Sequence, residues 1–271
     1  MENGHGAPEP LDLPILVTVE ADGRLATLTL NRPHARNAIS RGMAAALAAG
    51  LRDLAAFKTL RVVVVTGAGE RAFSAGADLA ERRGMTPAER SAHTDAIAAA
   101  ADALAALPVP TIAAVRGFAL AGGAEFALAC DLRVAADDAV FGFPEVAIGI
   151  FPGAGGAVRL PRLIGRGAAN DLLFTGRRVT AAEALRLGLV NRVVSAAEVD
   201  AVARTIADQV VANAPLAIRA LKQTLTEGAG LPDGPAHHLA RRHRRPLDAT
   251  ADYAEGLAAF AERRVPHFTG E

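Results

Sequence analysis

Two glutamates, Glu125 and Glu145, each stand beside a glycine-rich segment that could present free backbone N–H groups. Glu125 follows the glycines of residues 117–123 at the start of a run of strong helix formers, and Glu145 precedes the glycines of residues 152–156. The first turn of a helix has N–H groups without intrahelical partners and carries partial positive charge, which suits a developing oxyanion. Two nearby carboxylates can serve as general acid and general base. The pattern therefore predicts acid–base chemistry on a group that gains negative charge.

A third glycine-bearing turn, residues 72–79, offers further N–H donors for the same oxyanion. Taken singly, each feature has a simpler explanation. Each turn could be only a connection between a strand and a helix. Glu125 could simply stabilise a helix N-terminus, by about 0.3–1 kcal/mol, and Glu145 could be a turn residue after Pro144. Only the combination of both acids with the turns favours a catalytic site.

The segments around these residues alternate between strand and helix patterns. Residues 108–115 form a short apolar run bounded by prolines, which predicts a buried strand directly before the glycines. Residues 62–65 are four consecutive valines, too apolar for an edge strand. Asp22 and Gly23 between two alternating runs predict a β-hairpin. This alternation through the first two-thirds of the chain predicts an α/β fold. Further strands are expected at 15–20, 25–30, 132–135 and 139–141, and helices at 41–57 and 89–107.

The pattern becomes mainly helical beyond residue 156. Ser195 and Pro215 are each placed to open a helix, and Pro246 interrupts a tail that is helical by composition. We expect three parts, namely a disordered tail over residues 1–14, an α/β core over residues 15–195 and a C-terminal helical region over residues 196–271.

Composition excludes several classes of function. The chain has 29 basic and 29 acidic side chains, so no overall field attracts a polyanion such as DNA or RNA. Its one cysteine, Cys130, excludes an internal disulfide and is expected to be a small buried apolar side chain. The sequence shows neither a secretion-signal pattern nor an apolar run of the roughly 18 residues that a spanning helix needs. These observations predict a cytoplasmic protein with no membrane or nucleic-acid partner.

Four segments of the chain, residues 30–38, 72–79, 117–131 and 141–156, carry motifs in the order that a known family has them. It resembles the enoyl-CoA hydratase/isomerase (crotonase) superfamily from about residue 15 to residue 270. That resemblance implies a crotonase-like spiral of ββα units, a C-terminal helical region that makes trimer contacts, and acyl-CoA substrates. The expected assembly is a homotrimer or a dimer of trimers.

The resemblance also implies the roles of individual residues. The oxyanion-hole N–H groups correspond to Ala75 and Gly122, and the two acids of a hydratase correspond to Glu125 and Glu145. We expect Glu125 to activate water and Glu145 to protonate C2, although two close acids titrate as a coupled pair and could exchange these roles. No cofactor is implied, because CoA is part of the substrate.

Substrate binding is implied for four further residues, Arg36, Gly76, Ala77 and Asp78, with Arg36 near the CoA portion. Residues 76–82 also resemble the family members that act on methylglutaconyl-CoA, so a branched acyl chain is an alternative. Two other readings remain open. The chain could be an enoyl-CoA Δ-isomerase that uses a single acid, or a catalytically silent acyl-CoA-binding paralogue.

Two residues depart from the family pattern. Ala121 replaces the first glycine of a triplet that many members have, and Phe143 stands where hydratases often have Gln or Leu. The Phe143 ring beside Glu145 is expected to alter the acyl pocket or to desolvate that acid.

Charged clusters elsewhere are expected to be structural. Asp78 has no second acid or histidine at ligand spacing, so we expect it to begin a helix rather than bind a metal. The arginines of residues 241–245 are expected on a solvated or subunit-facing surface rather than on RNA. The histidines at 237, 238 and 243 lack the i, i+4 spacing of metal ligands on a helix.

Overall fold

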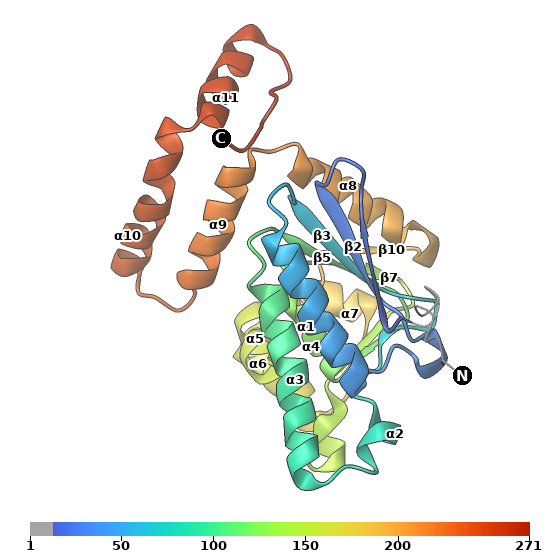
Figure 1. Ribbon diagram of the computed structural model, residues 1–271. Helices are drawn as coiled ribbons and strands as arrows, with labels where there is room; N and C mark the ends of the chain where they lie inside the picture. The colour runs from blue at the N-terminus through green and yellow to red at the C-terminus, as the bar shows by residue number, and fades with distance from the viewer. Residues whose placement is uncertain (1–12) are drawn as a thin grey trace, which may run out of the picture.

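Two β-sheets form the centre of residues 13–271, the part of the chain that the computed structural model describes (Figure 1). In the larger sheet β1 and β2 pair antiparallel, as the predicted hairpin requires, and all other neighbours are parallel. Its order is β1 (Ile15–Val19), β2 (Leu25–Leu30), β3 (Val62–Gly67), β5 (Thr111–Val115), β7 (Leu132–Ala136) and β10 (Arg192–Val194).

The smaller sheet has strands of three residues each. Its order is β4 (Ala72–Ser74), β6 (Phe118–Leu120), β8 (Val140–Gly142) and β9 (Arg178–Thr180). The chain passes repeatedly from a strand of the larger sheet to one of the smaller sheet and then to a helix, which confirms the predicted spiral of ββα units. The expectation of one continuous turn over residues 117–123 was wrong, because β6 pairs with β4 and β8 in the middle of it. Three residues are too few to show a periodic pattern.

Helices cover the larger sheet. The four valines of β3 are all buried although their side chains alternate in direction, so both faces of this strand are covered. Helices α1 (Arg41–Ala56) and α3 (Pro87–Ala105) lie side by side (Figure 1), and α8 (Val199–Val211) packs against β3, β5 and β7. The shorter helices are α2 (Leu79–Arg82), α4 (Gly122–Ala129), α5 (Gly156–Ile164), α6 (Arg166–Thr175) and α7 (Ala181–Arg186).

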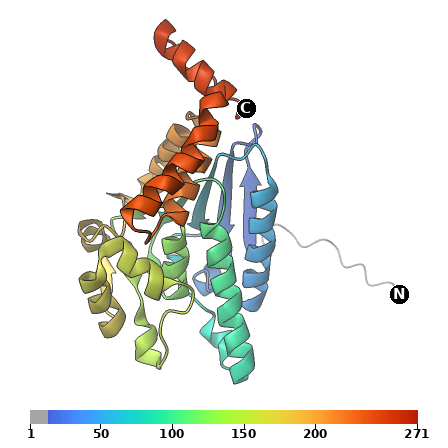
Figure 2. The same ribbon diagram turned by 90° about the vertical axis from the view of Figure 1, so that its left-hand side faces the viewer.

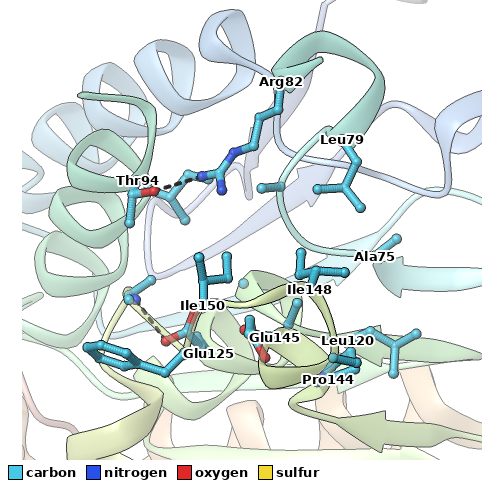
Figure 3. A pocket seen from close by; sticks show the side chains of 18 residues that line it. Ala75, Leu79, Arg82, Thr94, Leu120, Glu125, Pro144, Glu145, Ile148 and Ile150 are labelled. Carbon is cyan, nitrogen blue, oxygen red and sulfur yellow. Dashed lines mark hydrogen bonds between the residues drawn. The ribbon is translucent and has the colours of Figure 1, made fainter. Parts of the chain in front are cut away.

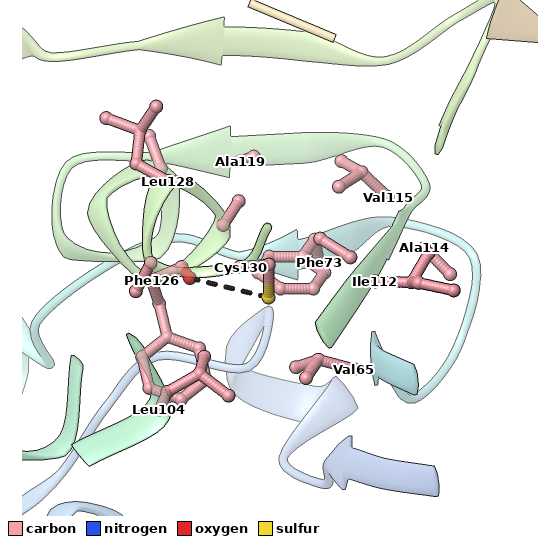
Figure 4. Close-up of a cluster of buried hydrophobic side chains, with 14 of the residues drawn as sticks. Val65, Phe73, Leu104, Ile112, Ala114, Val115, Ala119, Phe126, Leu128 and Cys130 are labelled. Atoms are coloured by element: carbon pink, nitrogen blue, oxygen red, sulfur yellow. Dashed lines mark hydrogen bonds between the residues drawn. The ribbon is translucent and has the colours of Figure 1, made fainter. Parts of the chain in front are cut away.

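Cys130 lies in the buried core, as predicted. Figure 4 shows its sulfur among apolar side chains from β3, β4, β5 and α4, including Val65, Phe73, Ile112 and Phe126. Burial raises the pKa of the Cys130 thiol to about 12. The thiol therefore stays protonated and acts as a small apolar group.

Three helices extend from this body, namely α9 (Pro215–Glu227), α10 (Asp233–Arg244) and α11 (Ala251–Glu262) (Figures 1 and 2). Lys222 of α9 ties them to the core, because its ammonium lies 2.7 Å from the carboxylate of Asp131. Phe260 of α11 is 87% exposed, and other apolar side chains of this region are also uncovered. In residues 13–271 no helix has the length and apolar character needed to cross a bilayer.

The proposed division of the chain stays a prediction. The tail that the sequence predicts to be disordered lies outside the described residues except for its last two, Leu13 and Pro14. Helix α8 follows the expected boundary near residue 195 but packs on the core sheet, so the helices that extend outward begin with α9.

Candidate active site

A cavity of about 250 Å³ lies where the N-terminus of α4 meets the segment that follows β4. Glu125, Glu145, Gly122, Ala75 and Ala77 all line it, and Figure 3 shows the two carboxylates close together on one wall. The structure thus brings together residues from three separate glycine-rich segments of the sequence. The rest of the lining is mainly apolar.

The backbone beside the cavity is tightly packed. Gly76 has a φ of +87°, and a Cβ at this position would lie only 2.9 Å from the nitrogen of Gly122 and from the Cβ of Ala121. A side chain at residue 76 would therefore push the two segments apart. Ala121 itself has φ 49° and ψ −129°, a conformation that costs a non-glycine residue about 1–3 kcal/mol. This strained residue sets the direction in which α4 begins.

Two backbone N–H groups converge on the cavity. Ile39 donates to the carbonyl of Gly76 at 2.7 Å and accepts from the N–H of Asp78 at 3.0 Å. Because neighbouring residues of an extended chain point their N–H groups in opposite directions, the N–H of Ala77 faces away from Ile39. Gly122 is the first residue of α4, so its N–H has no intrahelical partner. A Cβ built on Gly122 would lie 3.7 Å from the Ala77 nitrogen, so these donors are neighbours.

The assignment of an oxyanion donor to Ala75 was wrong. The Ala75 N–H donates to the carbonyl of Arg36 at 3.0 Å and is therefore already satisfied. Within residues 13–271 the N–H of Ala77 has no such acceptor. The donor pair that the geometry offers is Ala77 with Gly122. The left-handed conformations of Arg36 and Gly76 decide whether the N–H of Ala75 or that of Ala77 is free. The sequence does not reveal these conformations.

Glu125 is held in a fixed position by the second glycine-rich junction. Its Oε1 accepts hydrogen bonds from the N–H groups of Ala154 and Gly156, both at 2.8 Å. The side chain is only 3% exposed, and burial raises its pKa, while the two N–H donors oppose that rise. Across the described chain both hydrogen bonds go to Oε1, which leaves Oε2 for a water molecule. The carboxylate is thus held in one orientation by Oε1, while Oε2 can still accept a hydrogen bond.

Glu145 has a different environment. It lies in a 3₁₀ turn, Pro144–Ile148, and its Oε2 is buried without a hydrogen-bond partner among residues 13–271. Burial raises the pKa of Glu145 to about 7, opposed by its own backbone N–H and reinforced by the charge of Glu125. The protonated form of this carboxyl is therefore favoured far more than for an exposed glutamate. A buried oxygen without a protein partner is suited to exchanging a proton with a bound molecule.

The expected effect of Phe143 on the acyl pocket was wrong. Its ring is fully buried in the core and does not line the cavity. The apolar walls instead come from residues that the sequence reading did not single out, Ile97, Ile148, Ile150 and Phe151. Arg82 and Thr94 also line the cavity and were missed.

Three of the four other proposed substrate-binding residues do not line the cavity; only Ala77 does. Asp78 begins α2, as predicted, because its Oδ1 accepts from the N–H groups of Ala80 and Glu81. Its Oδ2 lies 2.9 Å from Nη1 of Arg32, and although burial acts to raise the pKa of Asp78, this pair keeps it below its usual value. The Asp78 carboxylate therefore fixes the start of α2 beside Ala77 and does not line the cavity. Arg36 is exposed, and its contact with CoA stays a prediction.

Across residues 13–271 no three His, Cys, Asp or Glu side chains gather as metal ligands would. The expectation that the protein needs no metal stays a prediction. Part of the arginine-rich run on α10 is paired, with Arg242 near Glu227 and Arg244 near Asp248.

Comparison with known proteins identifies the family. A sequence model of the family described as enoyl-CoA hydratase/isomerase matches residues 20–271. The chain belongs to this family. A short-chain-enoyl-CoA hydratase of Clostridium acetobutylicum is 39% identical over 248 residues, which cover 92% of this chain and 95% of that protein. Enoyl-CoA hydratase domain-containing protein 2 of Homo sapiens, a mitochondrial protein, is 39% identical and covers 98% and 92%.

Solved structures agree with this membership of the enoyl-CoA hydratase/isomerase family. The crystal structure of enoyl-CoA hydratase from Bacillus anthracis has a TM-score of 0.93 and 39% identity, covering 95% of this chain and all of that one. The crotonase-like fold expected from the sequence is therefore confirmed. Because relatives include mitochondrial forms, a cytoplasmic location stays a prediction.

Proposed function

We propose that the protein hydrates 2-enoyl-CoA thioesters. The observation that carries this proposal is the pair of buried glutamates in different environments, Glu125 and Glu145, facing the free N–H groups of Ala77 and Gly122 in one cavity. Hydration needs one group that takes a proton from water, one that delivers a proton to carbon, and donors that stabilise the enolate oxygen. The site offers all three.

The proposed reaction balances without a redox partner. Glu125 takes a proton from water while the water oxygen bonds to C3, and the π electrons of the C2–C3 bond move onto the thioester oxygen. The N–H groups of Ala77 and Gly122 stabilise that charge, at a site where one lost donor typically reduces the rate by about 10²–10³-fold. The electrons then return to form a C2–H bond with the proton of Glu145. Proton exchange returns both acids to their starting states.

The two environments support this division of roles. Glu145 has a pKa of about 7 because it is buried, so it carries a proton often enough to serve as the acid. Glu125 is fixed by two backbone N–H groups that favour its ionised form, which suits a base. CoA enters as part of the substrate, and the absence of any other cofactor stays a prediction.

Direct assay of the wild-type protein tests the proposal against its alternatives. With crotonyl-CoA we expect loss of absorbance at the enoyl-thioester band, because hydration removes the conjugated double bond. Turnover of a 3-enoyl-CoA with no hydration of any 2-enoyl-CoA would instead favour an isomerase, which needs one acid. Tight binding without turnover of either thioester would indicate a silent binding protein.

We also propose that the protein assembles as a homotrimer or a dimer of trimers. Support comes from the helices that extend from the body and leave apolar side chains uncovered, among them Leu225, Leu257 and Phe260. Exposed apolar patches of this kind are typical of subunit interfaces. Light scattering at micromolar concentration should give three or six times the chain mass, and a stable monomer would contradict the proposal.

A further inference from the structure

Arg82 places a guanidinium on the wall of the cavity opposite the two glutamates (Figure 3). Its Nη2 donates to Oγ1 of Thr94 at 2.9 Å, and its Nε donates to Nδ1 of His93 at 3.3 Å. His93 is held by the carbonyl of Ile39, 3.0 Å from Nε2, so its Nδ1 is the acceptor nitrogen. Burial and the charge of Arg82 lower the pKa of His93, which keeps this imidazole neutral. Both known partners of Arg82 are therefore uncharged.

Among residues 13–271 no carboxylate lies within 4.0 Å of the Arg82 guanidinium. The acid nearest to it in sequence, Glu81, is turned to Arg41, whose Nε and backbone N–H it binds at 2.9 and 3.0 Å. Other arginines near the core are paired, such as Arg32 with Asp78 and Arg159 with Asp102. Arg82 is thus a cation held in place without a counter-charge of its own.

The surroundings of Arg82 make an anionic partner favourable. Ile97, Ile148 and Ile150 line the cavity around it, and burial lowers the pKa of its guanidinium. A partly desolvated charge is stabilised by an opposite charge, and a guanidinium binds a carboxylate through parallel N–H donors. Its Nη1 has no partner in the described chain and is free to donate. Glu125 and Glu145 would repel a second carboxylate from the opposite wall.

We propose that Arg82 binds a carboxylate carried by the acyl group of the substrate, so that the site selects 2-enoyl-CoA thioesters with a second acid group. This inference rests on the proposed hydratase function. Attraction by Arg82 and repulsion by the glutamates would together orient the acyl chain, with its free acid away from the reacting double bond. The phosphates of CoA are a second possible source of an anion, and they are common to every thioester.

A matched pair of thioesters tests this selectivity. The first is (E)-4-carboxybut-2-enoyl-CoA, and the second is its neutral carboxamide of the same size. Wild type should hydrate the acid with the higher kcat/KM. Arg82→Met should lower kcat/KM for the acid by at least about 30-fold, the loss typical of removing one partner of a buried charge pair. The same variant should change kcat/KM for the carboxamide by less than about threefold.

Three controls separate the charge of Arg82 from its structural contacts. Arg82→Lys keeps the charge and should retain part of the preference for the acid. Arg52→Met removes an equal charge from an exposed residue of α1 and should leave the preference unchanged. Thermal melts show whether each variant is folded and as stable as wild type. If Arg82→Met does not fold, Arg82→Gln provides a second uncharged variant, whose amide nitrogen can still donate to Nδ1 of His93 as Nε of Arg82 does.

Two results would overturn the inference. If Arg82→Met loses kcat/KM equally for the acid and the carboxamide, Arg82 holds CoA or only positions α2. If wild type hydrates both thioesters with equal kcat/KM, the site does not distinguish the second acid group. Failure of wild type to hydrate any thioester would instead overturn the hydratase proposal. Calorimetry with the saturated 4-carboxybutanoyl-CoA and its carboxamide would still test Arg82 in that case, because tighter binding of the acid should be lost in Arg82→Met.

Discussion

Replacing Glu145 with glutamine should lower the rate of 2-enoyl-CoA hydration by about 10²-fold or more, the contribution typical of one acid–base group. The wild-type protein should also lose kcat/KM as the pH rises above about 7, because in the proposed mechanism the protonated form of Glu145 delivers the proton to C2. That alkaline fall should be absent in Glu145→Gln, since an amide does not titrate. A pH profile of both proteins measures this difference.

The stability of the same variant gives an independent readout. Burial raises the pKa of folded Glu145 from 4.5 to about 7, so the protonated carboxyl favours the folded state. This stabilisation is fully present below pH 4.5 and is lost as the pH rises through about 7. Glutamine cannot ionise, so Glu145→Gln should lose less stability than wild type between pH 5 and pH 8 in thermal melts. An identical loss in both proteins would contradict the raised pKa.

Glu125→Gln separates hydration from isomerisation. A two-acid hydratase should lose about 10²-fold or more in this variant, and Glu125→Gln with Glu145→Gln together should cost much less than the product of the single losses, because the acids act as a unit. Glu70→Gln, at an exposed glutamate, serves as the matched control. Hydration that survives in Glu125→Gln would reject the two-acid mechanism, while unchanged isomerisation of a 3-enoyl-CoA would indicate an isomerase.

The sequence predicted the parts of the fold that rest on local patterns. The hairpin, the all-valine strand β3 and the helix that opens at Pro215 all have strong periodicity or start signals, and the structure confirms each of them. The strands β6 and β9 have three residues each and are defined by pairing with distant strands. Such pairings leave too short a pattern in the chain to be read in advance.

In the candidate site, too, local sequence features could be predicted and contacts between distant residues could not. Residue type and spacing singled out Glu125 and Glu145, the family resemblance added Gly122, and the structure brings all three into one cavity. The choice between Ala75 and Ala77 depends on a hydrogen bond between residues 39 positions apart, and no local pattern encodes it. The significance of Arg82 depends on the absence of an acid beside it, because Glu81 turns to Arg41. Only the packing of α1, α2 and α3 reveals that absence.

Gly122→Pro should abolish most of the activity through the loss of a single backbone N–H. Gly122 is the first residue of α4, where proline is favoured and where the N–H has no helical partner to lose. A Cβ at this position would lie 3.6 Å from the Cα of Gly76 and 3.7 Å from Cγ2 of Ile97, both ordinary contacts. The helix should therefore form normally while kcat/KM for crotonyl-CoA falls by about 10²–10³-fold, the cost of one oxyanion donor.

Gly122→Ala is the matched control for this substitution. Alanine adds the same Cβ but keeps the N–H, so its kcat/KM should stay within about threefold of wild type. Circular dichroism and thermal melts establish that both variants are folded, and the Kd of the saturated butanoyl-CoA separates loss of binding from loss of the rate. If proline and alanine reduce activity equally, the effect belongs to the added carbon and Gly122 is not an oxyanion donor. If only proline does so while butanoyl-CoA still binds, the N–H of Gly122 acts mainly in the transition state, as the pairing with Ala77 requires.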